Sequence, residues 1–95
     1  MKPMAVIKRD GKAVPFEAVR IAGAISRALH AERVRDEGLA QELARVVEEH
    51  LARVAERPEV GLEEVQDAVV HVLQESGHYE VAITYARYRD ARERA

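Results

Sequence analysis

VIKRDGKAVPFEAVRI, residues 6–21, contains a predicted strand pair followed by the start of a helix. The runs 5–9 and 12–14 are compatible with strands, and they flank Asp10-Gly11, the dipeptide that most favours a two-residue type I′ turn. We therefore predict a β-hairpin with a two-residue loop. In that register the paired residues are Arg9 with Lys12, Lys8 with Ala13, and Ile7 with Val14.

Beyond Pro15 and Phe16 the apolar residues change from strand spacing to helical spacing. This change predicts a helix from about Glu17 to His30, with Arg20 in its first turn. The apolar face of this helix is predicted to hold Ala18, Ala22, Ile25 and Leu29.

The same segment gathers positive charge at the predicted helix start. Lys8 and Arg9 lie in the hairpin, and Arg20 lies on the helix, within reach of its first unpaired backbone N–H groups. These N–H groups and the positive end of the helix dipole attract anions, so the combination suits a phosphate group. On the residues alone, a solvated basic hairpin at a sheet edge is the alternative.

The rest of the chain predicts three further helices. One begins near Leu39 and ends near Arg57, before Pro58; one begins near Glu63 and ends before a Gly77 cap; and one runs from about Tyr79 to Glu93. Residues 59–61 follow Pro58 and could add a third strand beside the hairpin. The predicted apolar faces of the two middle helices hold Leu39, Leu43, Val46, Val47, Leu51, Val54, Val65, Val69, Val72 and Leu73.

These elements predict a single domain over residues 1–95, of mainly-α α+β class. It would be a four-helix bundle capped by a two- or three-stranded sheet, in which the N-terminal hairpin acts as a lid. An even number of antiparallel helices returns the C-terminus to the N-terminal end. The tyrosines of the last helix are interpreted as packing residues rather than stacking platforms: Tyr79, Tyr85 and Tyr88.

Composition excludes several classes of protein. A chain that is 47% hydrophobic and 34% charged is globular rather than disordered, and the absence of cysteine excludes disulfides, zinc ribbons and thiol chemistry. There is no long apolar run and no signal-peptide pattern, so we expect a soluble, cytoplasmic protein without membrane association. The net charge of −2 disfavours bulk attraction to DNA.

The distribution of charge is more informative than its total. Residues 1–12 carry a net charge of +3 and residues 84–95 carry +2, so the middle of the chain carries −7. Basic ends on an acidic body suggest that the two termini cooperate in one anion site. A basic helix end is also what the helix dipole favours without any ligand.

The sequence contains little evidence for a metal site or a catalytic site. His71 and Glu75 are one turn apart, and His50 and His78 lie elsewhere, but no third ligand is fixed by spacing, so we expect no metal site. Gly11-Lys12 lacks the upstream glycine and the Ser or Thr of a Walker loop, and no Ser-His-Asp set or carboxylate pair can be argued. We therefore expect a chain that is not an enzyme.

Several separated motifs resemble one family. VIKRDG at 6–11, the Pro-Phe-acid-x-x-basic-Ile pattern at 15–21, VQDAV at 65–69, SGHYEVA at 76–82 and YARYR at 85–89 follow each other with the order and spacing of the ATP-cone. This family is the small nucleotide-binding regulatory domain of ribonucleotide reductases and of their transcriptional repressor. The resemblance covers residues 6 to about 92.

The resemblance implies a role for each cation. Lys8 and Arg9 correspond to the motif residues that hold phosphates, and Arg20 takes the place of the family's usual lysine on the first helix. Arginine is planar and bidentate whereas lysine is a point charge, so the phosphate contact would differ in geometry. On the last helix the implied phosphate contact is Arg89, followed by Arg92.

The resemblance also implies contacts to the nucleoside. Glu17 matches an acid or amide of the family, and Gln66 could offer the paired donor and acceptor that an adenine edge requires. Val14 departs from members of the family that have a polar residue there, and this departure bears on base selectivity. The implied apolar contacts are Val6, Ile7, Ile21, Leu62 and Val65. Apart from Leu62, each of them has a plain core role as the alternative.

Together these implications describe an allosteric domain that binds ATP or dATP with Mg²⁺. Binding would relieve repulsion among the hairpin cations and change association with itself or with a ribonucleotide reductase subunit. One alternative is an interaction adaptor of the same fold that binds an acidic partner and no nucleotide. A small DNA-binding helical protein is a further alternative, which the acidic middle of the chain disfavours.

Overall fold

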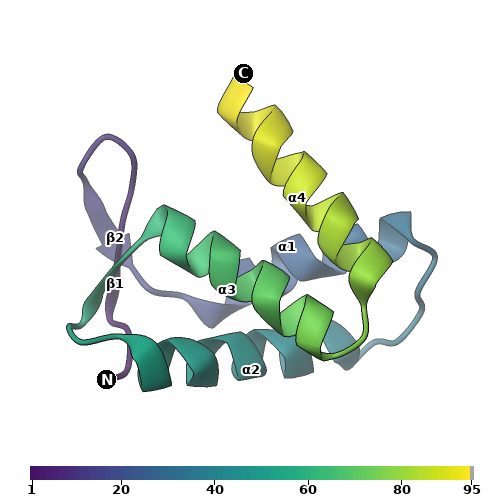
Figure 1. Cartoon of the computed structure of the whole chain (residues 1–95), viewed down its shortest axis with the longest axis horizontal. Coiled ribbons are helices and arrows are strands. Elements are labelled where there is room, and N and C mark those ends of the chain that lie inside the picture. Colours follow the sequence, from purple (N-terminus) through teal and green to yellow (C-terminus); the bar gives the residue numbers. More distant parts are fainter. Residues whose placement is uncertain (95) are drawn as a thin grey trace.

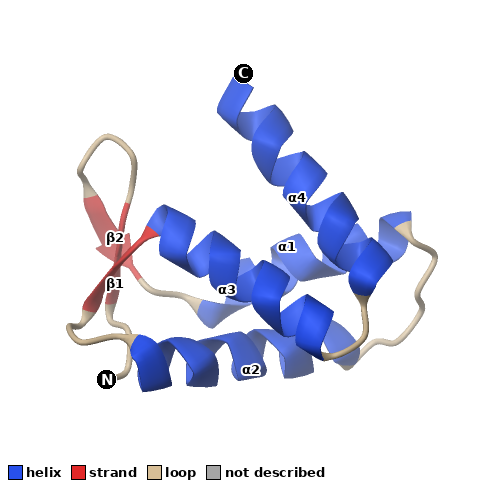
Figure 2. Cartoon of the chain, in the orientation of Figure 1, coloured by secondary structure: helices blue, strands red, loops and turns tan. Residues whose placement is uncertain are grey.

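Four helices and a three-stranded sheet make up the part of the chain that this computed structural model describes, the backbone of residues 1–94 and the side chains of residues 1–91 (Figure 1, Figure 2). The predicted mainly-α α+β class is therefore confirmed. In chain order the elements are β1 (Ala5–Ile7), β2 (Ala13–Pro15), α1 (Ala18–Ala31), α2 (Leu39–Val54), β3 (Glu59–Gly61), α3 (Leu62–Glu75) and α4 (Tyr79–Arg94).

The hairpin forms as predicted, but its predicted register was wrong by one residue. β1 and β2 pair antiparallel with Ile7 opposite Ala13. The backbone N–H of Lys8 then donates to the Lys12 carbonyl over 2.9 Å, which leaves a three-residue loop, 9–11. The like-charged pair beside the loop is therefore Lys8 and Lys12, in place of Arg9 opposite Lys12.

The backbone of the loop explains this register. A type I′ turn requires a positive φ at both of its central residues, and aspartate adopts one only at a cost. In the observed loop only Gly11 has a positive φ, of 85°, and its N–H donates to the Lys8 carbonyl over 2.9 Å. The Asp10 carboxylate accepts a hydrogen bond from the Lys12 N–H over 3.0 Å, which fixes the far side of the loop.

The predicted third strand is present, and it lies beside β1 rather than β2. The strand order is β2-β1-β3, and β3 runs parallel to β1 with Val6 opposite Val60 and Ile7 opposite Gly61. The Met4 N–H donates to the Pro58 carbonyl over 2.8 Å where this pairing begins. Because α3 begins directly after β3, the sheet holds the start of α3 next to the hairpin (Figure 1).

The core lies between the helices, and two strands add to it: Val60 of β3 is buried in it and half-buried Val6 of β1 packs against it. The predicted inner faces of α1, α2 and α3 are largely confirmed, although Val54 is exposed. Helix α1 packs against α2, α2 against α3, and α4 against both α1 and α3. The largest fully buried side chains are Ile25, Val47, Val60, Val69 and Leu73.

Helix α4 is buried along only part of its length. Its last turns extend beyond α1 and α3 (Figure 1), so only side chains of its first turns reach the core. Tyr85 is buried as predicted, but Tyr79 is 64% exposed and Tyr88 46% exposed, so the prediction that all three tyrosines pack was wrong. On the α1 side, the Thr84 hydroxyl donates to the Glu32 carboxylate over 2.7 Å.

Two glycines give a matched stability prediction. Gly77 ends α3 with a φ of 81°, while Gly23 lies inside α1 with helical backbone, and a Cβ at either would meet no atom within 4 Å. Gly77→Ala should therefore destabilise the fold by about 1–2 kcal/mol. Gly23→Ala should stabilise it by about 0.5–1 kcal/mol. Chemical unfolding of both variants tests the pair, and a Gly77→Ala variant as stable as the parent would contradict the backbone argument.

Candidate functional site

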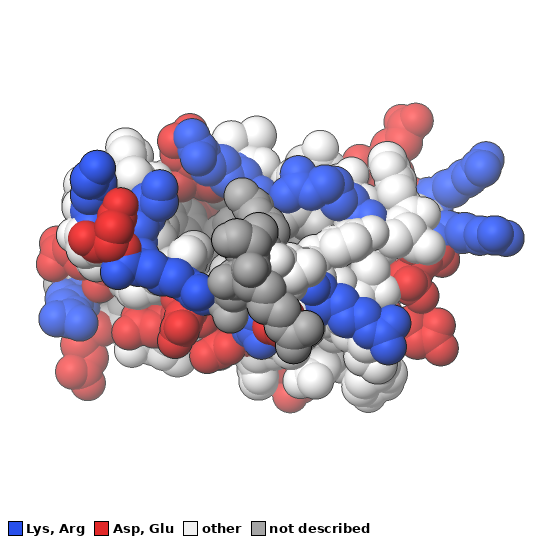
Figure 3. All heavy atoms as spheres, turned by 90° about the horizontal axis from the view of Figure 1, so that it is seen from above, with Lys and Arg blue, Asp and Glu red and all other residues white. Residues whose placement is uncertain are grey.

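The tip of the hairpin presents two of the five cations that are predicted to bind phosphate. Lys8 and Arg9 are exposed, next to Lys12, and the face shown in Figure 3 carries basic side chains at the hairpin side and along the rest of its length, with acids among them. Val6 and Ile7, which lead into the loop on β1, are half-buried. These two apolar side chains are therefore partly covered and partly accessible.

The sheet and an ion pair join this loop to the start of α3. Gly61, which lies opposite Ile7, is the N-cap residue of α3, and half-buried Leu62 follows it. A guanidinium nitrogen of Arg9 lies 3.7 Å from a carboxylate oxygen of Glu63 in the first turn of α3. Val65, two residues further along α3, is buried in the core. The structure thus brings the hairpin and the predicted base-binding segment of α3 together.

A second ion pair joins α3 to α4. Arg89 Nη1 lies 3.2 Å from Asp67 Oδ1, and Arg89 Nε lies 3.4 Å from the Asp90 carboxylate. The Arg89 side chain is only 24% exposed, so it is held against the body of the domain. The side chain of Arg92, the other predicted cation of this helix, lies outside the described residues.

The start of α1 contributes the remaining predicted residues. Glu17 is the N-cap residue of α1, and its carboxylate lies 3.5 Å from Arg20 Nε, whose side chain is 79% exposed. The Phe16 N–H donates to the Met4 carbonyl over 2.9 Å, so this helix start is tied to the sheet. Ile21 is buried in the core. Among the described residues, Arg20 pairs within its own helix and forms no ion pair with α3 or α4.

Gln66 stands out chemically in α3. Its Oε1 atom is buried and has no hydrogen-bond partner among the residues that the structure describes. Leaving such an atom unpaired costs about 1–3 kcal/mol, which a donor from a ligand would recover. Gln66 shares one helix face with Glu63 and Asp67, the carboxylates that contact the hairpin loop and α4.

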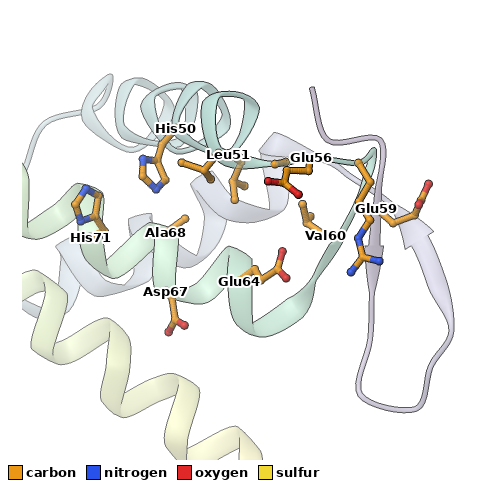
Figure 4. Close-up of a pocket in the computed structure, with 12 residues that line it drawn as sticks. His50, Leu51, Glu56, Glu59, Val60, Glu64, Asp67, Ala68 and His71 are labelled. Atoms are coloured by element: carbon orange, nitrogen blue, oxygen red, sulfur yellow. The ribbon is translucent and has the colours of Figure 1, made fainter. Parts of the chain in front are cut away.

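An acidic groove between α2 and α3 was missed in the sequence prediction (Figure 4). Its signal was present as a series of acids on both sides of β3. The charged and titratable residues that line the groove are His50, Glu56, Arg57, Glu59, Glu64, Asp67 and His71. This excess of carboxylates makes the groove unsuited to phosphate. None of the described residues that the sequence predicts to bind the nucleotide lines it.

The groove holds two histidines without a metal cluster. The rings of His50 and His71 face each other from α2 and α3, with centroids 4.8 Å apart (Figure 4). Within residues 1–91, no three His, Asp or Glu side chains are arranged to hold a metal ion. The described helices also include none that is long and apolar enough to cross a membrane.

His50 predicts a pH dependence of stability. Partial burial, and then the positive charges of His71 and Arg53, lower its pKa in the folded chain. The unfolded chain, with a histidine pKa of about 6.5, therefore takes up this proton first as the pH falls. Protonation of His50 should therefore leave the free energy of unfolding unchanged above about pH 6.5 and should lower it below that pH. Urea unfolding between pH 7.5 and 5.5 should show a smaller decrease for His50→Gln, and equal decreases would contradict this assignment.

Comparisons with known proteins agree on one domain family. A family model described as the ATP cone domain matches residues 4–94. The ribonucleoside-diphosphate reductase subunit alpha of Chlamydia pneumoniae is 34% identical over 97% of this chain and 10% of its own length. The anaerobic ribonucleoside-triphosphate reductase of Escherichia coli K12 is 38% identical over 93% of this chain and 12% of its own.

A third relative has a different reductase chemistry in its name. The vitamin B12-dependent ribonucleoside-diphosphate reductase of Mycobacterium tuberculosis H37Rv is 34% identical over 95% of this chain and 12% of its own length. This chain thus spans about a tenth of the length of the curated relatives it matches. The shared part is the domain, whichever reductase carries it.

Proposed function

This chain belongs to the ATP-cone domain family, as its motifs predicted, and we propose that it is an allosteric domain that binds ATP or dATP and is not itself an enzyme. The nucleotide would lie between the hairpin loop, the start of α1, and the adjoining faces of α3 and α4. The triphosphate, accompanied by Mg²⁺, would contact Lys8, Arg9, Arg20 and Arg89, with Arg92 as a further contact.

The observation that carries this proposal is the unpaired Oε1 of Gln66. Gln66 is close on α3 to Glu63 and Asp67. These two acids contact Arg9 of the loop and Arg89 of α4, which are proposed to bind phosphate. A side-chain amide can accept a hydrogen bond from the adenine amino group and donate one to a ring nitrogen. Gln66 would therefore read the base while the surrounding cations hold the phosphates.

The remaining proposed contacts flank the base and ribose. Half-buried Val6, Ile7 and Leu62 are partly accessible near this face, and Glu17 lies at the N-terminus of α1. Ile21 and Val65 are buried, so we propose that they support these contacts mainly from the core. The wholly apolar side chain of Val14 gives the hairpin no polar group with which to select a base.

The proposed output is a change of association. Binding would neutralise cations on the loop, on α1 and on α4 together, which would fix the position of these elements relative to one another. The ordered surface would then bind a ribonucleotide reductase subunit, or a second copy of the domain, more or less tightly. The reductase names of the relatives support this choice of partner.

Isothermal titration calorimetry against ATP, dATP, GTP and ADP, at constant Mg²⁺, tests the proposal. We expect ATP or dATP to bind most tightly, with ADP weaker because it has one phosphate fewer and GTP weaker because its base edge differs. At 100 times its dissociation constant the ligand should stabilise the fold by about 2.7 kcal/mol. For a domain of this size that raises the melting temperature by about 10 °C or more. Binding of none of the four would support the adaptor alternative.

A further inference from the structure

Two acids of α3 form ion pairs with arginines of the proposed phosphate site. Asp67 Oδ1 lies 3.2 Å from Arg89 Nη1, and Glu63 Oε1 lies 3.7 Å from Arg9 Nη2. The two acids are one helical turn apart and share the face that holds Gln66. One face of α3 therefore contacts both an arginine of the hairpin loop and an arginine of α4.

We propose that Glu63 and Asp67 set the affinity of the nucleotide site by competing with phosphate for Arg9 and Arg89. A phosphate oxygen that binds either guanidinium would have to take the place of a carboxylate oxygen that carries the same sign of charge. This inference rests on the proposed function, because it concerns how tightly the same site binds its ligand. It adds two residues that the family motifs did not assign to binding.

Charge and exposure indicate whether a phosphate or a carboxylate binds these arginines more strongly. Asp67 is 78% exposed, so a displaced carboxylate can turn into water, and ion pairs of this kind are individually weak. A triphosphate carries several negative charges and can bridge two arginines, so it displaces the acids. The displaced acids remain near the phosphates and repel them, which weakens binding further. Adenosine needs neither arginine, so the acids should not affect its binding.

The next acid on α3 provides a matched control. Figure 4 shows Glu64 pointing into the groove between α2 and α3, whereas the carboxylate of Asp67 points toward α4. Glu64→Gln changes the net charge as much as Glu63→Gln or Asp67→Asn does, and it does so on the same helix. Any difference between these variants then reports the local ion pair rather than the total charge.

Calorimetry with ATP and with adenosine tests the proposal on the whole chain. Asp67→Asn should tighten ATP binding by about two- to fivefold, the range expected for loss of an exposed ion pair. Glu63→Gln should tighten it less, because Glu63 lies 3.7 Å from Arg9 whereas Asp67 lies 3.2 Å from Arg89. Glu64→Gln should change it by a smaller factor, since exposed charges at a distance are screened by salt. Adenosine should bind the parent and all three variants equally.

Two results would overturn the inference. Weaker ATP binding by Asp67→Asn would mean that Asp67 positions Arg89 for the phosphate instead of competing with it. Equal effects of Asp67→Asn and Glu64→Gln would mean that only the net charge matters. A parent chain that binds no ATP would instead reject the proposed function itself. Thermal unfolding of each variant, followed by circular dichroism, confirms that the compared proteins are folded.

Discussion

Replacing Lys8 and Arg20 together with alanine should weaken ATP binding by two orders of magnitude or more. Each side chain is exposed and is proposed to make a charge-assisted contact to the triphosphate, and such contacts contribute about 1.5–3 kcal/mol each. Losing both should therefore cost about 3 kcal/mol at least, which corresponds to about a hundredfold. Calorimetric titration with ATP measures the loss directly.

A charge-matched double variant separates local contacts from net charge. Lys2 and Arg53 are also exposed, and neither belongs to the proposed site. Lys2→Ala with Arg53→Ala should leave ATP affinity within a few-fold of the parent, because exposed distant charges are screened. A Lys8→Ala, Arg20→Ala protein that keeps its helical circular dichroism and binds ATP like the parent would reject the phosphate assignment.

The second large effect concerns stability. Leu73→Ala should destabilise the domain by about 2–5 kcal/mol, because it leaves a cavity at a fully buried position of α3. For a domain of this size, that loss lowers the melting temperature by about 10 °C or more. Val19→Ala, at an α1 position that is 71% exposed, should change stability by about 0.5 kcal/mol or less. Similar losses for the two variants in urea unfolding would contradict the described core.

Helical periodicity predicted most of the fold because the middle helices bury one continuous face. In α2 and α3 the apolar spacing alone identified buried Leu43, Val47, Val69 and Leu73. In α4 the same reasoning failed for Tyr88, which lies beyond the first turns that α1 and α3 cover. It also failed for Tyr79, which lies two residues before buried Val81 and therefore on the opposite side of the helix. Where a helix projects past its neighbours depends on how the helices pack, which local spacing does not encode.

The hairpin shows a different limit of sequence reasoning. Asp10-Gly11 suits a two-residue loop and also a three-residue loop in which only the glycine adopts a positive φ. In the three-residue loop, the Lys12 N–H also donates a hydrogen bond to the Asp10 carboxylate. The contribution of such a local side-chain hydrogen bond to the choice of loop is difficult to estimate from sequence. The existence of the turn was therefore predictable, whereas the pairing of its strands was not.

The residues of the candidate site stay a prediction, and the ion pairs that they form were not predicted from the sequence. The family motifs placed cations on the hairpin, α1 and α4, and named Gln66 on α3. The partners of Arg9 and Arg89 depend on how α3 meets the hairpin and α4, which only the folded chain defines. A signal did exist: Glu63 lies three residues before Gln66 and four before Asp67, and these two spacings make each of them a neighbour of Glu63 on the helix surface.

The parallel pairing of β1 with β3 also constrains how the domain can form. Residues 5–7 find their second partner only at residues 59–61, so this contact has a long separation in sequence. Such contacts raise the contact order and slow folding, because a long loop must close before they form. During synthesis on a ribosome, β1 would be paired on one edge only until α2 and β3 had emerged. A chain truncated before residue 59 would leave that edge open to pairing with another chain.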